Sequence, residues 1–288
     1  MKKTAYILDS SSFLTEEEAN KLGFHYMPLH VIIEGEDYLE GKTLDLDMLK
    51  EAIENKRNVS TSQPSPGEVI QLVEQLKSEG YDQAVFSGIA SGLSKTQENV
   101  INTAKEDGFK VYNIDSKSVG NASKYPLIKA RKLIEEDKME IEEAIKYVQE
   151  SEALKSLTTV SVGDLFHLSR GGRITPAAAA LGSMLKIKPI LKLVLEKDGQ
   201  IDSVEKVRTE KKALKKMVEL TLKPFNLNNS VVLIADFYGK DVAKELEKIV
   251  HEVYPELEIE RYNLSPTIGV HVGLDSVGLQ IVDISMLK

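Results

Sequence analysis

Short apolar runs that alternate with longer amphipathic segments constrain the fold of this chain more than any other feature. In the first half, the runs at residues 4–8, 84–86 and 110–114 are expected to be strands. Helices are expected at residues 16–22, 44–53, 66–77 and 96–105, and residues 24–33 form a further apolar and aromatic stretch. Strands that alternate with helices are typical of a parallel sheet with helices on both faces. We therefore expect residues 1–155 to form a doubly wound, mostly parallel, Rossmann-like α/β domain.

The order of elements changes in the second half of the chain. Charged helices within residues 130–155 lead into a Thr- and Val-rich run at 157–162, where we place the domain boundary. Further strands are expected at residues 191–195, 204–207, 231–236, 257–262, 269–272 and 279–284, and further helices from Pro176 and at 211–222 and 242–253. Because the late strands are joined by short turns, residues 156–288 are expected to form an α+β domain with a mixed sheet.

The composition excludes several classes of function. With 288 residues the chain has room for two domains, each with its own core. The absence of cysteine rules out disulfides, thiolate catalysis and Cys-ligated metal sites, and we expect neither a metal nor a cofactor. A formal net charge of -8 argues against a protein that binds nucleic acid, because phosphate contacts need clustered Lys and Arg.

No segment is expected to cross a membrane or to direct export. The small and apolar stretch of residues 177–195 is interrupted by Lys186, Lys188 and Lys192, which a bilayer span would not tolerate. The apolar stretch near the N-terminus ends at Asp9, before it could form the apolar region of a signal peptide. We therefore expect a cytoplasmic protein.

Four short segments rich in hydroxyl groups and glycine are the strongest indications of a binding site. They are Asp9-Ser10-Ser11-Ser12, Ser60-Thr61-Ser62-Gln63-Pro64, Ala90-Ser91-Gly92-Leu93-Ser94 and Gly269-Val270-His271-Val272-Gly273. Each follows or interrupts an apolar run, where strand ends and helix N-termini direct unpaired N–H groups outward. Neutral donors of this kind suit one small anion, such as a carboxylate or a phosphate. The sequence therefore predicts one polar pocket, between and within the two domains.

For the hydroxyl residues, a structural role competes with ligand binding. Ser94 could simply cap the helix that is expected to follow it. A phosphate-binding P-loop is rejected, because Ile89 and Ser94 occupy the positions of its required glycines. Residues 60–62 could cap the helix that begins at Pro66, but three adjacent hydroxyls exceed what one cap needs. The surplus leaves ligand binding and capping equally open for this segment.

The histidines offer one candidate site residue. His25 and His30 lie five apart in an expected strand, so their side chains face opposite sides and cannot share a metal. His271 lies between Gly269 and Gly273 in an expected strand-to-turn setting, where the backbone could approach a ligand closely. A lone histidine is more commonly a structural residue, so both interpretations stay open.

A serine hydrolase is an alternative function, with Ser94 as nucleophile and His271 as base. None of the serines lies in a Gly-x-Ser-x-Gly sequence, so the strained turn that exposes such a nucleophile is not indicated. Another triad geometry stays open, because triads recur on unrelated folds in different chain orders.

Two arginines lie in basic clusters. Arg173 follows two glycines just before an expected helix, where a guanidinium could hold a phosphate or fix a domain interface. Arg208 lies near Lys211 and Lys212, where a solvated helix start is the simpler explanation.

Taken in order along the chain, these motifs resemble those of the DegV family of bacterial fatty-acid-binding proteins. The motifs are Asp9-Ser10-Ser11, Thr61-Ser62-Gln63-Pro64, Ser91-Gly92-Leu93-Ser94, Gly172-Arg173-Ile174, Leu185-Lys186-Ile187-Lys188-Pro189-Ile190, Val207-Arg208-Thr209, Gly269-x-His271-x-Gly273 and Gly278-Leu279. Each piece is weak by itself. Their ordered combination is specific and spans nearly the whole chain.

The resemblance implies a two-domain α/β protein that holds one long-chain fatty acid in a deep tunnel. It further implies a non-catalytic, lipid-binding subunit of a bacterial fatty acid kinase, which presents the carboxylate to an ATP-binding partner. That partner makes an acyl phosphate for phospholipid synthesis. A fatty-acid carrier without a kinase stays an alternative, as does the serine hydrolase.

The resemblance also implies roles for single residues. Thr61 and Ser94 would contact the carboxylate, with Ser62 and His271 beside it. Arg173 and Arg208 would lie near the face used in phosphoryl transfer or by the partner. A buried carboxylate needs compensation, which the hydroxyls and a protonated His271 could provide.

Overall fold

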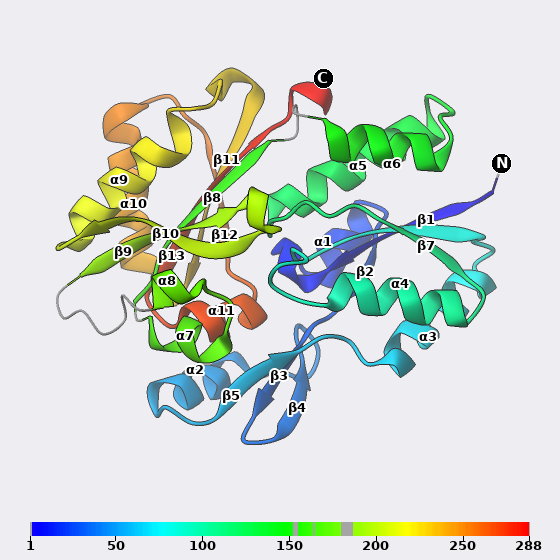
Figure 1. The fold of residues 1–288 in the computed structure, drawn as a ribbon, viewed down its shortest axis with the longest axis horizontal. Helices are drawn as coiled ribbons and strands as arrows, with labels where there is room; N and C mark the ends of the chain where they lie inside the picture. Colours follow the sequence, from blue (N-terminus) through cyan, green and yellow to red (C-terminus); the bar gives the residue numbers. More distant parts are fainter. Residues whose placement is uncertain (1, 152–154, 164, 180–186, 288) are drawn as a thin grey trace.

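A computed structural model of the chain describes residues 2–151, 155–163, 165–179 and 187–287, which form three sheets (Figure 1). Leu185 and Lys186, which belong to one of the family-like motifs, lie outside the described residues. Parallel and mixed sheets occupy the N-terminal and C-terminal parts respectively, which confirms the predicted fold class.

The N-terminal sheet is parallel and carries helices on both faces. Its strand order is β2 (His25–Met27), β1 (Thr4–Asp9), β6 (Gln83–Ser87) and β7 (Lys110–Asn113). Ala5 and Ile7 of β1 pack towards α3 (Pro66–Ser78) and α4 (Thr96–Glu106). Tyr6 and Leu8 pack towards α1 (Glu16–Lys21), α5 (Asn121–Glu135) and α6 (Ile141–Glu150). Because successive side chains of a strand point to opposite faces, both faces of β1 are apolar.

A small antiparallel sheet interrupts this domain and was not predicted. Its strand order is β4 (Glu36–Leu39), β3 (His30–Ile33) and β5 (Val59–Ser62), and α2 (Leu46–Glu54) lies between β4 and β5 in the chain. The apolar stretch of residues 24–33 therefore contains two strands of different sheets, β2 and β3. Pro28 between them has no N–H to donate, so it cannot continue the ladder of β2. The assumption of one strand containing His25 and His30 was wrong.

The C-terminal sheet is mixed. Its strand order is β10 (Gln200–Val207), β9 (Lys188–Val194), β8 (Ser156–Ser161), β13 (Ser276–Asp283), β11 (Ser230–Phe237) and β12 (Ile259–Asn263). Only the β11 and β12 pair is parallel among the described strand pairs of this sheet. Helices α9 (Glu210–Leu222) and α10 (Lys240–Val253) cover one face of the sheet. The other face is left for contacts with the N-terminal part.

The strand expected at residues 269–272 is wrong, because these residues belong to helix α11 (Pro266–Val272). Ile268, Val270 and Val272 are β-branched and favour a strand on propensity alone. Tertiary packing overrides this preference. Gly269 lies against the ring of Phe237, so closely that a Cβ atom at this position would meet the ring at 2.3 Å. The sequence could show the apolar residues but not this contact.

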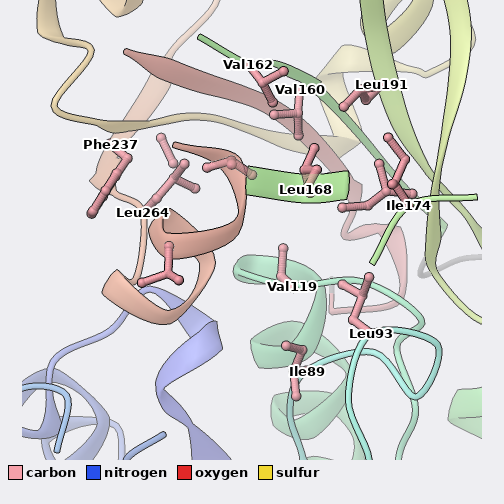
Figure 2. Packing of buried hydrophobic residues seen from close by; sticks show 14 of the residues in the cluster. Ile89, Leu93, Val119, Val160, Val162, Leu168, Ile174, Leu191, Phe237 and Leu264 are labelled. Atoms are coloured by element: carbon pink, nitrogen blue, oxygen red, sulfur yellow. The ribbon is translucent and has the colours of Figure 1, made fainter. Parts of the chain in front are cut away.

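An apolar cluster joins the two halves of the chain on the inner face of the mixed sheet. Figure 2 shows Ile89, Leu93 and Val119 of the N-terminal part below Leu168 and Val160 of the C-terminal part. The cluster also includes Val31 and Leu49 of the small sheet and α2, among other buried residues. This cluster packs residues from both sides of the boundary that we place between residues 155 and 156. The boundary itself remains our proposal.

Candidate functional site

A mostly apolar cavity lies between the two halves of the chain. It contains about 900 Å³ of space free of atoms, open solvent at its mouth included. Its apolar lining comprises Phe13, Leu29, Ile89, Leu93, Val119, Val160, Leu193, Ile201, Leu233, Ala235, Leu264, Ile268 and Val272. Phe13 and Ile89 come from the loops after β1 and β6, at the carboxyl edge of the parallel sheet. Ligands of open α/β sheets bind outside this edge.

Polar side chains from four separate segments line the same cavity. This group comprises Thr61, Ser62, Gln63, Ser94, Arg173 and His271, and Thr158, Thr267 and Gln280 line other parts of the cavity wall. Thr61, Ser62, Ser94 and His271 are therefore in this lining, and Arg173 lies there with them. The segment Asp9-Ser10-Ser11-Ser12, expected in the same pocket, does not line it. These residues are buried, and the Asp9 carboxylate accepts from the N–H groups of Ser11 and Ile89 instead. Arg208 does not line the cavity; it is exposed between β10 and the N-cap of α9.

Thr61 and His271 join the two halves of the chain at the polar part of the cavity. Thr61 Oγ1 and His271 Nε2 share a hydrogen bond of 2.8 Å, although the residues are 210 positions apart. Thr61 is held by β5, where it pairs with Val31 of β3. His271 is held in the last turn of α11, with its ring against Gly171, where a Cβ atom would lie 2.4 Å from Nδ1. The strand-to-turn setting expected for His271 was wrong, but the close backbone approach is present.

Thr61 and Ser62 do not cap the helix that follows them. Ser65 caps α3, and it forms a reciprocal capping box with Glu68. This cap satisfies the helix N-terminus, so the hydroxyls of Thr61 and Ser62 are not needed there. These two side chains line the cavity instead.

Ser94 has a local structural contact as well as a place in the cavity. Its Oγ lies 2.8 Å from Thr96 Oγ1 and accepts from the Thr96 N–H at 3.3 Å. The loop that carries it is fixed by Gly92, whose N–H donates to the Asp198 carbonyl at 2.8 Å. A Cβ atom on Gly92 would lie 2.6 Å from that oxygen. The loop therefore depends on glycine for its contact with the β9–β10 connection.

His271 is neutral near pH 7 in this structure. Burial, followed by the charge of Arg173 and by His167, lowers the pKa of His271 to about 4. The protonated His271 that could have compensated a buried carboxylate is therefore not what this structure favours. A neutral imidazole can still donate or accept one hydrogen bond at Nε2.

Arg173 supplies the positive charge of the cavity. Its Nε donates to the Leu93 carbonyl at 3.3 Å, and its Nη1 donates to the Gly171 carbonyl. No carboxylate lies within ion-pair distance of this guanidinium in the described part of the chain. Because both its contacts are to neutral carbonyls, its charge is available to an anionic ligand.

The polar residues that the sequence analysis missed are spread over other elements. Thr158, Thr267 and Gln280 line the cavity in addition to the predicted residues, and so does Gln63, which belongs to the predicted segment of residues 60–64. Gln280 could have been noticed as the one amide inside the apolar run of residues 277–282. Thr158 and Thr267 give no signal that separates them from ordinary surface residues.

Residues 2–151, 155–163, 165–179 and 187–287 contain neither a candidate metal site nor a candidate membrane span. In those ranges no group of three or more His, Cys, Asp or Glu side chains could hold a metal ion. No helix within them is long and apolar enough to cross a membrane.

Comparisons with known proteins give one consistent result. A family model described as an uncharacterised protein of the DegV family matches residues 3–283. A DegV domain-containing protein of Listeria innocua is 35% identical over 287 residues, which cover 96% of this chain and 98% of that protein. Protein DegV of Bacillus subtilis is 30% identical over 280 residues, 96% of this chain and 97% of that protein.

Solved structures show the same fold. A fatty acid binding DegV family protein from Streptococcus agalactiae has a TM-score of 0.84 at 28% identity, over 98% of this chain and 99% of that one. DegV of Bacillus subtilis, described as a fatty acid binding protein, has a TM-score of 0.83 at 30% identity, over 98% and 100%. A stearic acid-binding protein from Eubacterium ventriosum has a TM-score of 0.82 at 24% identity, which supports the fold alone; it covers all of both chains.

Proposed function

The chain belongs to the DegV family, and from this premise we propose that it binds one long-chain fatty acid in the cavity between its halves. The observation that carries the proposal is the Thr61–His271 hydrogen bond beside Arg173, which gives a mostly apolar cavity a polar region with a cation. The carboxylate would bind there and the acyl tail would lie along the apolar lining. The solved relatives from S. agalactiae and B. subtilis, described as fatty acid binding, support this assignment.

The energetics favour an amphipathic ligand over a small polar one. Burial of about 15 methylenes at roughly 0.8 kcal/mol each supplies on the order of 12 kcal/mol before ordering costs. A hydrogen bond to a charged group adds only about 1.5–3 kcal/mol. The tail therefore sets the affinity, and the contacts of Thr61, Ser94 and Arg173 fix the position of the carboxylate.

Gly278 offers a direct test of where the tail lies. It lines the cavity on β13, and a Cβ atom there would meet its nearest neighbours at 3.8 Å, an ordinary contact distance. Gly278→Leu should fold, fill the cavity and lose binding of long-chain fatty acid in a titration, whereas Gly278→Ala should retain most of it. Equal affinity of Gly278→Leu and wild type would place the tail elsewhere.

We further propose that the protein presents the carboxylate to an ATP-binding fatty acid kinase subunit, which forms an acyl phosphate. Arg208 is exposed close to Lys211 and Lys212, where a guanidinium could offset charge that develops only during phosphoryl transfer. Arg208→Ala should leave fatty acid affinity unchanged and reduce acyl phosphate formation with the cognate kinase subunit. Arg173→Ala should lose affinity and melting temperature, because Arg173 also holds two backbone carbonyls.

The partner assay separates this proposal from a carrier without a kinase. Equal turnover by Arg208→Ala and wild type at saturating partner would exclude a role of Arg208 in transfer. A defect that disappears at high partner concentration would assign Arg208 to docking. No fatty-acid-dependent ATP consumption with any kinase subunit of the same cell would favour the carrier.

The hydrolase alternative has little support from the geometry. A serine nucleophile needs a base within hydrogen-bond reach. Ser94 Oγ is hydrogen-bonded to Thr96, and His271 Nε2 is hydrogen-bonded to Thr61, so the two side chains do not pair with each other in this structure. Ester turnover by the isolated wild-type protein that is lost in Ser94→Ala would restore this alternative.

A further inference from the structure

Two polar side chains of the mixed sheet line the cavity. Thr158 lies on β8 and Gln280 on β13, directly opposite each other in the mixed sheet. Every other described residue of the sheet that lines the cavity is apolar or glycine. An amide and a hydroxyl beside an acyl tail therefore need an explanation.

The position of Gln280 in the sheet separates it from the polar region. Ser276, at the start of β13, donates to the Val272 carbonyl of α11, one residue after His271. Gln280 lies four residues further along the strand, roughly 13 Å away at 3.3 Å per residue. Across the sheet, β13 lies three strand spacings from β10. Ile201 of β10 pairs through an isolated β-bridge with Ile174, the residue next to Arg173. At about 4.8 Å each, this separation is roughly 14 Å.

Gln280 is held rigidly by the N-terminal part of the chain. Its Nε2 donates to the Val119 carbonyl at 2.8 Å and to Thr158 Oγ1 at 2.7 Å. Its Oε1 accepts from the Ala122 N–H at 3.3 Å. Thr158 Oγ1 also lies 3.2 Å from Ser118 Oγ. The amide thus connects β13 to the segment around residues 118–122, of which Val119 also lines the cavity.

Phe13 lies against the same segment. It lines the cavity, and its ring packs on Gly120, where a Cβ atom would lie 2.6 Å from the ring and 3.3 Å from Gln280 Oε1. Residue 120 must therefore be glycine for the ring to occupy this position. The aromatic ring and the amide lie side by side against the same backbone segment.

We propose that Gln280, with Thr158 and Phe13, closes the cavity and sets the maximum length of acyl chain that the protein accepts. This inference rests on the proposed fatty acid binding. Both N–H groups of the amide are already used by Val119 and Thr158, so the amide has no donor left to recognise an oxygen atom on the tail. A longer tail would have to break these hydrogen bonds and would gain no further apolar contact.

The test is a titration of wild type with saturated fatty acids from dodecanoate to docosanoate. Each methylene that enters the apolar lining raises affinity roughly fourfold, and the rise stops at the length that reaches Gln280. In Gln280→Ala the rise should continue, so that affinity for the first lengths beyond the wild-type limit increases on the order of tenfold. Gln280→Met fills nearly the same volume and should keep the wild-type limit.

Two further variants complete the test. Gln280→Asn shortens the side chain by one methylene and gives a second route to a longer limit if Gln280→Ala does not fold. Gln71→Ala, at an exposed position of α3, should leave the whole series unchanged. An identical limit in wild type, Gln280→Ala and Gln280→Asn would overturn the inference and leave the proposed function standing. No binding of any length by wild type would overturn both.

Discussion

At the scale of single residues, the hydroxyls of Thr61 and Ser94 are the groups that would hold a carboxylate in place. One charge-assisted hydrogen bond is worth about 1.5–3 kcal/mol, or roughly tenfold to a hundredfold in affinity. Thr61→Ala and Ser94→Ala should each weaken fatty acid binding by this factor without abolishing it, since the tail contacts remain. Thr61→Ser keeps the hydroxyl and is the matched control. Wild-type affinity in both alanine variants would show that the carboxylate does not bind in this region.

His271 makes the stability of the ligand-free protein sensitive to acid. Its pKa is about 4 in the folded protein and near 6.5 in an unfolded chain, so only the unfolded chain takes up the proton between these values. Stability from this residue is therefore present at neutral pH and is lost as the pH falls through that window. Between about pH 7 and about pH 5, wild type should lose about 2 kcal/mol more than His271→Gln in urea unfolding.

Two buried carboxyl groups change the stability in the opposite direction as the pH falls, so the comparison with a variant is needed. Burial raises the pKa of Asp9 to about 6 and that of Glu40 to about 7. Both groups bind protons more readily in the folded protein, so they add stability as the pH falls through these values. Their contribution is common to wild type and His271→Gln and cancels in the difference. Identical pH profiles of the two proteins would mean that His271 is not desolvated.

At the scale of elements, helix α11 decides whether His271 reaches the cavity. Gly269 allows the helix to lie directly on Phe237, and Gly269→Ala would place a methyl carbon 2.3 Å from the nearest carbon of that ring. We expect Gly269→Ala to lower the melting temperature and to weaken fatty acid binding together, because α11 must move as a unit. Gly67→Ala in α3 is the matched control, since its Cβ atom would meet only Ser65 Oγ at 3.9 Å. Unchanged binding by Gly269→Ala would show that α11 tolerates the shift.

The elements that could be predicted are those in which the residues of a single segment show that it is buried. Strands β1 and β6 are buried throughout because both their faces are covered, and their central residues are apolar, so the pattern predicts a parallel sheet. Strands β4 and β5 are partly exposed and polar, so nothing in their own residues separates them from loops. Helix α11 was predicted as a strand because its preference for a helix comes from Phe237, on another element.

At the scale of the whole molecule, the site exists only because the two halves of the chain pack together. The sequence indicates each polar segment separately, since hydroxyls and glycines follow apolar runs. The contact between Thr61 and His271 depends on how β5 and α11 meet, and the position of Gln280 depends on the register of β8 and β13. Registers between distant segments are set by tertiary packing, so single-segment patterns could not provide them.

A ligand that fills a cavity between two halves also stabilises their association. Ligand that binds only the folded state adds stability by mass action, and the burial of a tail in a closed cavity disfavours its release into water. The central claim is therefore that the protein retains one long-chain fatty acid through purification.

Mass spectrometry of the purified recombinant protein tests this claim most directly. The mass measured under native conditions should exceed the mass measured after denaturation by that of one long-chain fatty acid, and organic extraction should recover the acid in about one-to-one ratio. Delipidated protein should take up one equivalent of added fatty acid. Protein that is purified without ligand and fails to bind added fatty acid would contradict the account.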